Sequence, residues 1–385
     1  MLVSMITSFL IFFVVFFRLS LFYPYFYFAL IPAVFGFFVF IKNINNKSSV
    51  IIRNQSQLFV FIMLVMITIF CFAYDLFQKS IDVQSSFFIR MSMLVVLSIL
   101  PAYFLVYNLK GDESRLKKII ILSIWIQIVL FLLMYFSDGA KHTLYSIFGM
   151  GDSVNLLDQN DRVRGFGLST EINYMSPFLM IFLCFFILQN KYFLLLMTCL
   201  TQIVNSNMAV LAIVTALVFS KIKLSTKIIA IIFLSIIVFS IGSILFPRFY
   251  DEFINSGGTR TLEILIQQHV FTIGTIDWFT SFFGFQQNIS SSIPDLSVSS
   301  DMGWVIMFNY GGGLFILQFI LLLVALSIAA FGHTKLAFVW FLVGILFNTK
   351  GLALGPNGYM FITFIYIFMR CYRAYEEKFL FKNIY

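Results

Sequence analysis

The chain is divided into apolar runs of about the length that an α-helix needs to cross a lipid bilayer, and this feature constrains the fold most. A crossing takes about 20 apolar residues, with a range of roughly 17–25. Of the 385 residues, 61% are hydrophobic and 11% are charged, whereas soluble domains carry about 25% charged residues. A soluble chain of this size could not hide so much apolar surface. We therefore expect an all-α, polytopic integral membrane helical bundle that forms a single membrane domain over residues 1–385.

The predicted spans follow these apolar runs, and the first run is interpreted as a span because it lacks the charged segment that opens a cleaved signal peptide. They are Leu2–Phe17, Leu21–Ile41, Leu58–Tyr74, Phe87–Tyr107, Ile119–Phe136, Tyr174–Leu188, Tyr192–Ser220, Ile228–Phe246, Trp304–Ala330, Leu336–Phe347 and Tyr359–Met369.

The run Tyr192–Ser220 decides the topology because it is long for a single crossing. Lys191 flanks one end, and Lys221, Lys223 and Lys227 flank the other. Positively charged flanks belong in the cytoplasm, so both ends can be cytoplasmic only if the run crosses twice. The polar residues Asn205-Ser206-Asn207 supply a turn at its middle. This split predicts about twelve crossings; one long tilted helix is the alternative.

With that split, basic and acidic residues fall on opposite sides of the membrane. The segments predicted to be cytoplasmic, both termini included, hold Lys42, Lys47, Arg53, Lys110, Arg115, Lys117, Lys118, Lys191, Lys221, Lys223, Lys227, Lys335, Arg370 and Arg373. The net charge of +8 is thus a topology signal, and no nucleic-acid partner is expected. Two exported loops stand out by length, at about residues 137–172 and 247–303, and long loops in compact proteins are commonly functional.

The first long loop contains the sequence Asp161-Arg162-Val163-Arg164-Gly165-Phe166-Gly167, followed by Glu171. Arginine presents a planar, permanently charged fork that binds phosphate through two hydrogen bonds. Glycines let the backbone approach a ligand closely. We therefore expect this loop to hold an anionic, pyrophosphate-linked substrate through Arg162 and Arg164.

The second long loop carries Gly257-Gly258-Thr259 before Arg260, and apolar residues then follow helical spacing as far as Phe271. An interfacial amphipathic helix with Arg260 at its N-terminus would form an anion site, since free N–H groups point outward there. The alternative is an arginine that contacts only solvent or lipid head groups. Arg248 and Lys350 are further candidate cations.

Two carboxylates are candidates for a general base, Asp301 and Glu171. Asp301 precedes a predicted span that contains Tyr310-Gly311-Gly312-Gly313, where we expect a glycine-rich break. It could accept a proton from a substrate hydroxyl, or it could simply cap the helix. No metal-ligand spacing is present, so neither a metal nor a cofactor is expected.

These motifs resemble those of the O-antigen polymerase (Wzy) family and, more distantly, those of the O-antigen ligases. The resemblance covers roughly Gln159 to Gly313. It includes the arginine motif with Glu171-Ile172-Asn173, the turn at Asn205-Ser206-Asn207, and Arg260 with the following Phe283-Gly284-Phe285. An arginine often found in that turn is missing here. Aspartate stands at 301 where the ligases carry histidine, which favours a polymerase.

The resemblance implies a membrane glycosyltransferase of the bacterial inner membrane whose active site faces the periplasm. Donor and acceptor would both be oligosaccharide repeat units on undecaprenyl pyrophosphate, with membrane lipids around them and a chain-length regulator as a potential partner. The alternatives are an O-antigen ligase and, from another class, a flippase or transporter of lipid-linked oligosaccharides. A transporter would place key charges near the membrane midplane at broken helices, whereas the candidate cations here lie in exported loops.

Overall fold

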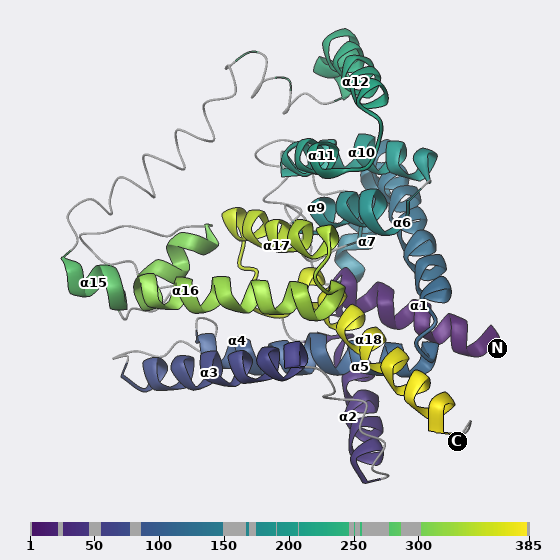
Figure 1. Cartoon of the computed structure of the whole chain (residues 1–385). Helices are drawn as coiled ribbons and strands as arrows, with labels where there is room; N and C mark the ends of the chain where they lie inside the picture. Colours follow the sequence, from purple (N-terminus) through teal and green to yellow (C-terminus); the bar gives the residue numbers. More distant parts are fainter. Residues whose placement is uncertain are drawn as a thin grey trace. The chain divides into compact units, whose positions relative to one another are not determined.

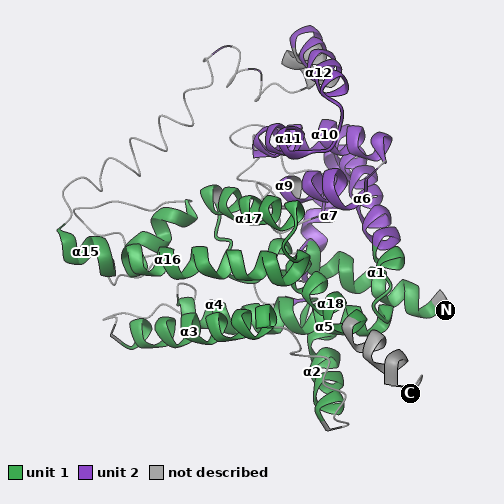
Figure 2. Ribbon diagram, in the orientation of Figure 1, with its two compact units in different colours: residues 1–16, 28–116, 268–385 green, residues 17–27, 117–267 purple. Residues whose placement is uncertain are grey.

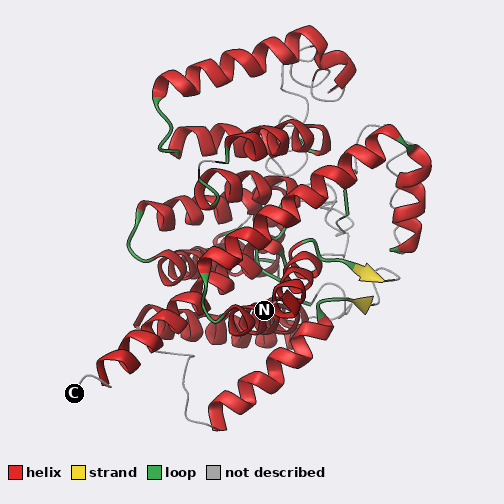
Figure 3. Cartoon of the chain, turned by 90° about the vertical axis from the view of Figure 1, so that its right-hand side faces the viewer, coloured by secondary structure: helices red, strands yellow, loops and turns green. Residues whose placement is uncertain are grey.

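The computed structural model describes residues 2–21, 26–45, 55–77, 86–148, 167–168, 175–189, 191–206, 208–245, 250, 255, 277–285 and 302–382. These residues are almost entirely helical (Figures 1 and 3). The helices from the N-terminus to residue 147 are α1 (Leu2–Phe16), α2 (Leu30–Asn45), α3 (Gln55–Phe77), α4 (Phe87–Leu94), the π-helix η1 (Val95–Ile99), α5 (Leu100–Leu109), α6 (Glu113–Phe136) and α7 (Asp138–Ile147). The later helices are α9 (Met175–Phe182), the π-helix η2 (Leu183–Ile187), α10 (Tyr192–Asn205), α11 (Met208–Phe219), α12 (Leu224–Leu245), α15 (Trp278–Phe283), α16 (Gly303–Phe331), α17 (Lys335–Phe347), the 3-10 turn η6 (Asn348–Lys350) and α18 (Gly358–Lys382).

Most of the helices lie over the predicted apolar runs, whereas α7 and α15 lie within the segments predicted to be exported loops. Among the described residues, 4 helices are long and apolar enough to cross a membrane by length and composition. They are Gln55–Leu76, Phe87–Leu109, Glu113–Phe136 and Gly303–Phe331. Several shorter apolar helices accompany them. The all-helical architecture expected of a membrane protein is therefore confirmed, while the number of crossings and their sidedness stay predictions.

Helix α3 has one buried face, and its other sides expose apolar side chains. Val60, Ile67, Cys71 and Asp75 are buried on one face. The other sides expose large apolar residues, namely Leu58, Phe59, Phe61, Ile62, Val65, Met66, Ile69 and Phe72. A continuous exposed apolar surface of this kind marks contact with lipid or with another protein, and hydrocarbon is the environment that suits it here.

The predicted division of the run Tyr192–Ser220 is confirmed. Helix α10 ends at Asn205, Ser206 has extended backbone angles, and α11 begins at Met208. The Ser206 side chain accepts the backbone N–H of Met208 at 3.2 Å, so this polar residue closes the first turn of the new helix. The two helices pack against each other, as a turn between two short helices requires.

The prediction of a helix from Leu21 was wrong at its beginning, because α2 starts only at Leu30. The preceding residues instead form a short antiparallel pair, β1 (Ser20–Leu21) and β2 (Phe26–Tyr27), in which Ser20 pairs with Tyr27. The sequence between them contains Pro24, and a proline disfavours helical angles at the residue before it. Apolar content alone did not reveal this interruption.

The chain divides into two compact units, shown separately in Figure 2. Unit 1 comprises residues 1–16, 28–116 and 268–385. In it α16 packs on α3, α15, α17 and α18, and α5 packs on α1, α2 and α18. Unit 2 comprises residues 17–27 and 117–267, and its α9 packs on α10 and α11.

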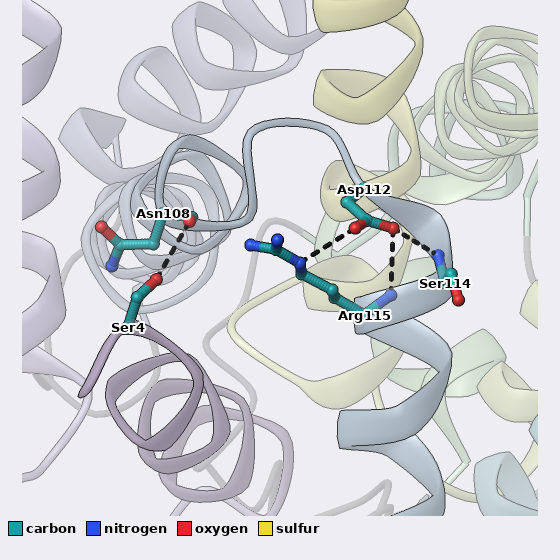
Figure 4. A network of polar contacts seen from close by, with 5 residues as sticks. All are labelled: Ser4, Asn108, Asp112, Ser114 and Arg115. Carbon is teal, nitrogen blue, oxygen red and sulfur yellow. Dashed lines mark hydrogen bonds and ion pairs between the residues drawn. The ribbon is translucent and has the colours of Figure 1, made fainter. Parts of the chain in front are cut away.

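Three of the basic residues that the topology assigns to the cytoplasm, Arg115, Arg370 and Arg373, make polar contacts within unit 1. The Asp112 carboxylate accepts the backbone N–H groups of Ser114 and Arg115 at 2.9 and 3.1 Å and pairs with the Arg115 side chain at 3.0 Å (Figure 4). Arg373 pairs with Glu113. Arg370 donates to the carbonyls of Ile328 and Ala329, both at 2.8 Å, at the end of α16. This grouping agrees with one common side for these segments.

Candidate functional site

Most of the site residues predicted from sequence lie outside the described part of the chain. This is so for Arg162, Arg164, Glu171, Arg248, Arg260 and Asp301, and for the predicted helix that follows Arg260. Lys350 is described as the last residue of η6. The structure does describe the residues next to several of these positions, and they show how the flanking segments are held.

The end of the arginine motif, Gly167 with the following Leu168, is fixed inside unit 2. The backbone N–H of Leu168 donates to Gln127 Oε1 at 2.9 Å, and Gln127 Nε2 donates in return to the Leu168 carbonyl. Tyr145 donates its hydroxyl to the Gly167 carbonyl at 2.8 Å. Burial raises the pKa of the Tyr145 phenol, so it remains a hydrogen-bond donor at neutral pH.

Only glycine fits at position 167. Its φ of +92° lies in the region that side chains rarely adopt. An added Cβ would also lie 2.7 Å from Gln127 Oε1. The anchor therefore requires the glycine at the end of the motif, where the sequence alone suggested close approach to a ligand.

Lys141 is a buried lysine that was not among the residues predicted from the sequence. Its side chain is 1% exposed, and it lies on α7 four residues before Tyr145. Residues four apart share a helix face, so Lys141 belongs to the face whose Tyr145 holds the motif. Buried lysines are rare unless paired. The sequence could have singled out Lys141, because it lies in a loop predicted to be exported and short exported loops carry few positive charges.

The glycine-rich break in α16 is confirmed. Gly311 and Gly312 leave the helical conformation, with φ of −136° and +63°. The end of α15 fills the break: the backbone N–H of Phe285 donates to the Asn309 carbonyl at 2.9 Å, and Tyr74 on α3 donates to the Phe283 carbonyl at 3.2 Å. The segment Phe283-Gly284-Phe285 is thus packed at this break, and Figure 1 shows α15 beside α16.

A buried carboxylate, Asp75, lies beside the break. One carboxylate oxygen accepts the Ser86 hydroxyl and the backbone N–H of Phe88, the latter at 3.0 Å. The other accepts the hydroxyl of Tyr310 at 2.8 Å, and this hydroxyl is also 3.0 Å from the Cys71 carbonyl. Asp75 is 7% exposed. These three donors hold the carboxylate in one orientation, and such a group is suited to positioning its neighbours.

The segments that follow Asp301 and Lys350 in the chain meet in the structure. Met302 forms a parallel bridge with Gly351. Asn348 and Asn357, both buried, fasten the loop between η6 and α18: Asn348 accepts the Ala353 N–H at 3.0 Å, and Asn357 donates to the Ala353 carbonyl at 2.9 Å. The beginning of α16 is therefore joined to a buried loop that two asparagine side chains fasten.

These features define a helical membrane protein with anchored polar segments, but no family. No group of three His, Cys, Asp or Glu residues that could hold a metal ion occurs among the residues that the structure describes. No family model, no curated protein and no solved structure matches the chain.

Proposed function

We propose that the chain is a polysaccharide repeat-unit polymerase of the O-antigen type, which joins oligosaccharides carried on undecaprenyl pyrophosphate at the periplasmic face of the inner membrane. The anchoring of Gly167 and Leu168 carries this proposal. A solvated loop needs no buried glutamine and tyrosine to fix its backbone, whereas a loop that aligns two arginines on a ligand must be held in one conformation.

In the proposed reaction, a hydroxyl of the acceptor sugar attacks the anomeric carbon of the donor glycan. The bond from that carbon to the pyrophosphate breaks, and the carrier leaves as undecaprenyl pyrophosphate. Arg164 and Arg260 would bind the departing pyrophosphate and stabilise its growing charge, with Arg162, Arg248 and Lys350 as further cations. Asp301, or Glu171 in its place, would take the hydroxyl proton.

Two other features support this assignment. The apolar outer faces of helices such as α3 suit the long hydrocarbon tail of the carrier lipid. The backbone bridge between Met302 and Gly351 joins the segments that follow the proposed base Asp301 and the proposed cation Lys350. An O-antigen ligase would use the same donor and would differ from the polymerase only in the acceptor to which it transfers the glycan.

A transporter of lipid-linked oligosaccharides is the second candidate, and the break in α16 favours it. Transporters build substrate sites at discontinuous helices with charged groups nearby, and Asp75 lies beside Gly311 through its bond to Tyr310. In this protein, however, the Asp75 oxygens are occupied by three donors and the end of α15 fills the break.

Deleting the gene and separating surface polysaccharide on a gel distinguishes the candidates. Loss of a polymerase leaves single repeat units attached to the acceptor. Loss of a ligase leaves none attached while lipid-linked polymer persists. Loss of a transporter leaves none attached and lets single lipid-linked units accumulate on the cytoplasmic side. We expect the first result, restored to full-length polymer by the wild-type gene.

A further inference from the structure

Helix α15 exposes a group of aromatic side chains that the function described above does not use. Trp278, Phe279 and Phe282 are 78%, 47% and 51% exposed. With about 100° of rotation per residue, these three positions lie on one side of the helix. The ring centroids of Trp278 and Phe279 are 5.9 Å apart, so the exposed rings adjoin one another. Together these three residues form the aromatic face of α15.

The end of α15 is fixed against the rest of unit 1. The Phe285 N–H donates to the Asn309 carbonyl of α16 at 2.9 Å, and Tyr74 of α3 donates to the Phe283 carbonyl at 3.2 Å. These two contacts hold the helix from α16 and from α3. The aromatic face is therefore turned outward by the packing of the helix and is not a free choice of side-chain rotamers.

The aromatic face adjoins the apolar outer side of α16. After the glycine break, Leu317, Leu321 and Val324 are exposed, and their spacing places them on one side of the helix. Gly313, one turn before Leu317, is exposed as well, and a Cβ there would lie 3.4 Å from the Ser281 carbonyl oxygen of α15. In a helix long and apolar enough to cross a membrane, this side suits contact with lipid. Helix α15 thus lies at the end of a lipid-facing side.

A charged group limits how deep in the membrane α15 can lie. Asp277 comes directly before the aromatic face, and its carboxylate accepts the Thr280 N–H at 3.0 Å. Hydrogen bonding to Thr280 lowers the pKa of Asp277, so this exposed carboxylate is ionised at neutral pH. A charge is costly in hydrocarbon, whereas tryptophan is enriched at the membrane–water interface and helices lying there present Trp and Phe to the lipid. The combination suits the level of the lipid head groups.

We propose that α15 is an interfacial helix whose aromatic face inserts among the lipid head groups at the exported surface of the membrane. The predicted topology assigns residues 247–303, which include α15, to that side. This role does not require the polymerase activity. Because the end of α15 also fills the break in α16, contact of the aromatic face with lipid would set the level of the break relative to the membrane surface.

Spin labels on single introduced cysteines test the position of α15 in the full-length protein, reconstituted in nanodiscs of phosphatidylethanolamine and phosphatidylglycerol. Trp278→Cys and Phe282→Cys place the label on the aromatic face. Leu317→Cys is the control for hydrocarbon, and His333→Cys is the control for water, because His333 is exposed between α16 and α17. The wild type, whose own cysteines are buried, gives the background labelling.

The measurement compares collisions with oxygen, which concentrates in lipid, and collisions with a nickel chelate, which stays in water. We expect the oxygen-to-nickel ratio at positions 278 and 282 to be several-fold higher than at His333. It should also be lower than at Leu317, because the head-group level is shallower than the hydrocarbon that Leu317 contacts.

Trp278 itself provides a second measurement that needs no label. Brominated lipids quench the fluorescence of tryptophan that they contact, and iodide quenches tryptophan that water contacts. Trp278→Phe should reduce the fraction of fluorescence that brominated lipids quench, and should leave the fraction quenched by iodide unchanged. A loss confined to the iodide-quenched fraction would contradict the contact with lipid.

Three results of the spin-label experiment would overturn the inference. A ratio at both positions equal to that at His333 would place the aromatic face in water, as expected for a surface that binds sugar rings. Low collision rates with both reagents would mean that another protein segment or a second copy of the chain covers it. A ratio equal to that at Leu317 would place the helix in hydrocarbon.

Discussion

Tyr310, the last residue before the glycine break of α16, donates its hydroxyl hydrogen to the buried Asp75 of α3 over 2.8 Å. The aromatic rings of Phe87 and Phe315 pack on Tyr310, with centroids 4.4 and 5.2 Å away. The first part of α16 is thereby fixed to α3 at the point where its own helical hydrogen bonding is interrupted. We infer that the hydrogen bond between Tyr310 and Asp75 sets the position of the helix segment that follows Asp301.

Tyr310→Phe should lower stability by about 1 kcal/mol, the usual contribution of a hydrogen bond between membrane helices. It should also shorten the polymer, because the segment after Asp301 would be held less firmly. Thermal unfolding in detergent and gel analysis of the polymer measure the two effects. Tyr366→Phe is the control, since the Tyr366 hydroxyl is buried without a hydrogen-bond partner in the described structure. Equal effects of both changes would contradict the role of the pair.

Gly312→Ala should be strongly destabilising, whereas Gly313→Ala should be tolerated. Gly312 has a φ of +63° and packs against the backbone of Phe282 and Gly284. At Gly313 the nearest atom to an added Cβ is the Ser281 carbonyl oxygen at 3.4 Å. Strain at a left-handed position alone costs about 1–3 kcal/mol. Expression and melting temperature of the two variants, side by side, test this difference.

Tyr145→Phe and Gln127→Leu should release the anchored end of the arginine motif. Each hydrogen bond contributes roughly 0.5–1.5 kcal/mol, and unpaired buried groups cost more. The loss should therefore be larger for Gln127, which makes two bonds with Leu168. Polymerisation should fall in both variants while the protein stays folded. Gln189→Leu, at an exposed glutamine, should be neutral, and wild-type polymer in Gln127→Leu would count against the anchor.

Arg164→Ala and Arg260→Ala should each abolish or strongly reduce polymerisation without loss of protein. A charge-assisted contact to phosphate is worth about 1.5–3 kcal/mol, and more where it stabilises the transition state. Lysine should restore activity only in part because it lacks the planar fork. A normal distribution of chain lengths in both alanine variants would remove these residues from the donor site.

Asp301→Asn keeps the shape and the capping ability of the side chain but removes its basicity. It should stop polymerisation if Asp301 is the base. The alternative that Asp301 is the N-cap of α16 was wrong, because the N-cap is Met302, so without a role as base the change should be nearly neutral. Normal polymer from Asp301→Asn with loss of polymer in Glu171→Gln transfers the role to Glu171. Polymer analysis of both variants, with protein amounts matched, decides between the two carboxylates.

Much of the fold was predictable because hydrophobic length and charge placement dominate in a membrane protein. The division at Asn205-Ser206-Asn207 and the break at Gly311 followed from local chemistry alone. The start of α2 was missed, since apolar content does not distinguish a helix from the short strands β1 and β2.

The polar contacts were less predictable because they join residues far apart in the chain. Asp75 and Tyr310 are separated by 235 positions, and nothing in either local sequence indicates the other. Gln127 and Lys141 carried a weaker signal. A glutamine inside an apolar run and a lysine in an exported loop are both unusual. Gln127 contacts the anchored end of the arginine motif directly, and Lys141 lies on α7, the helix whose Tyr145 also holds that end.

Reconstitution of the purified protein tests the proposed polymerase activity. Lipid-linked repeat units, isolated from the deletion strain in which they accumulate, are added to proteoliposomes that contain the purified protein. We expect a ladder of lipid-linked polymers with release of one undecaprenyl pyrophosphate per bond formed, and no ladder with Arg164→Ala. Movement of the units across the bilayer without any polymer, or transfer only to a lipid A core acceptor, would contradict it.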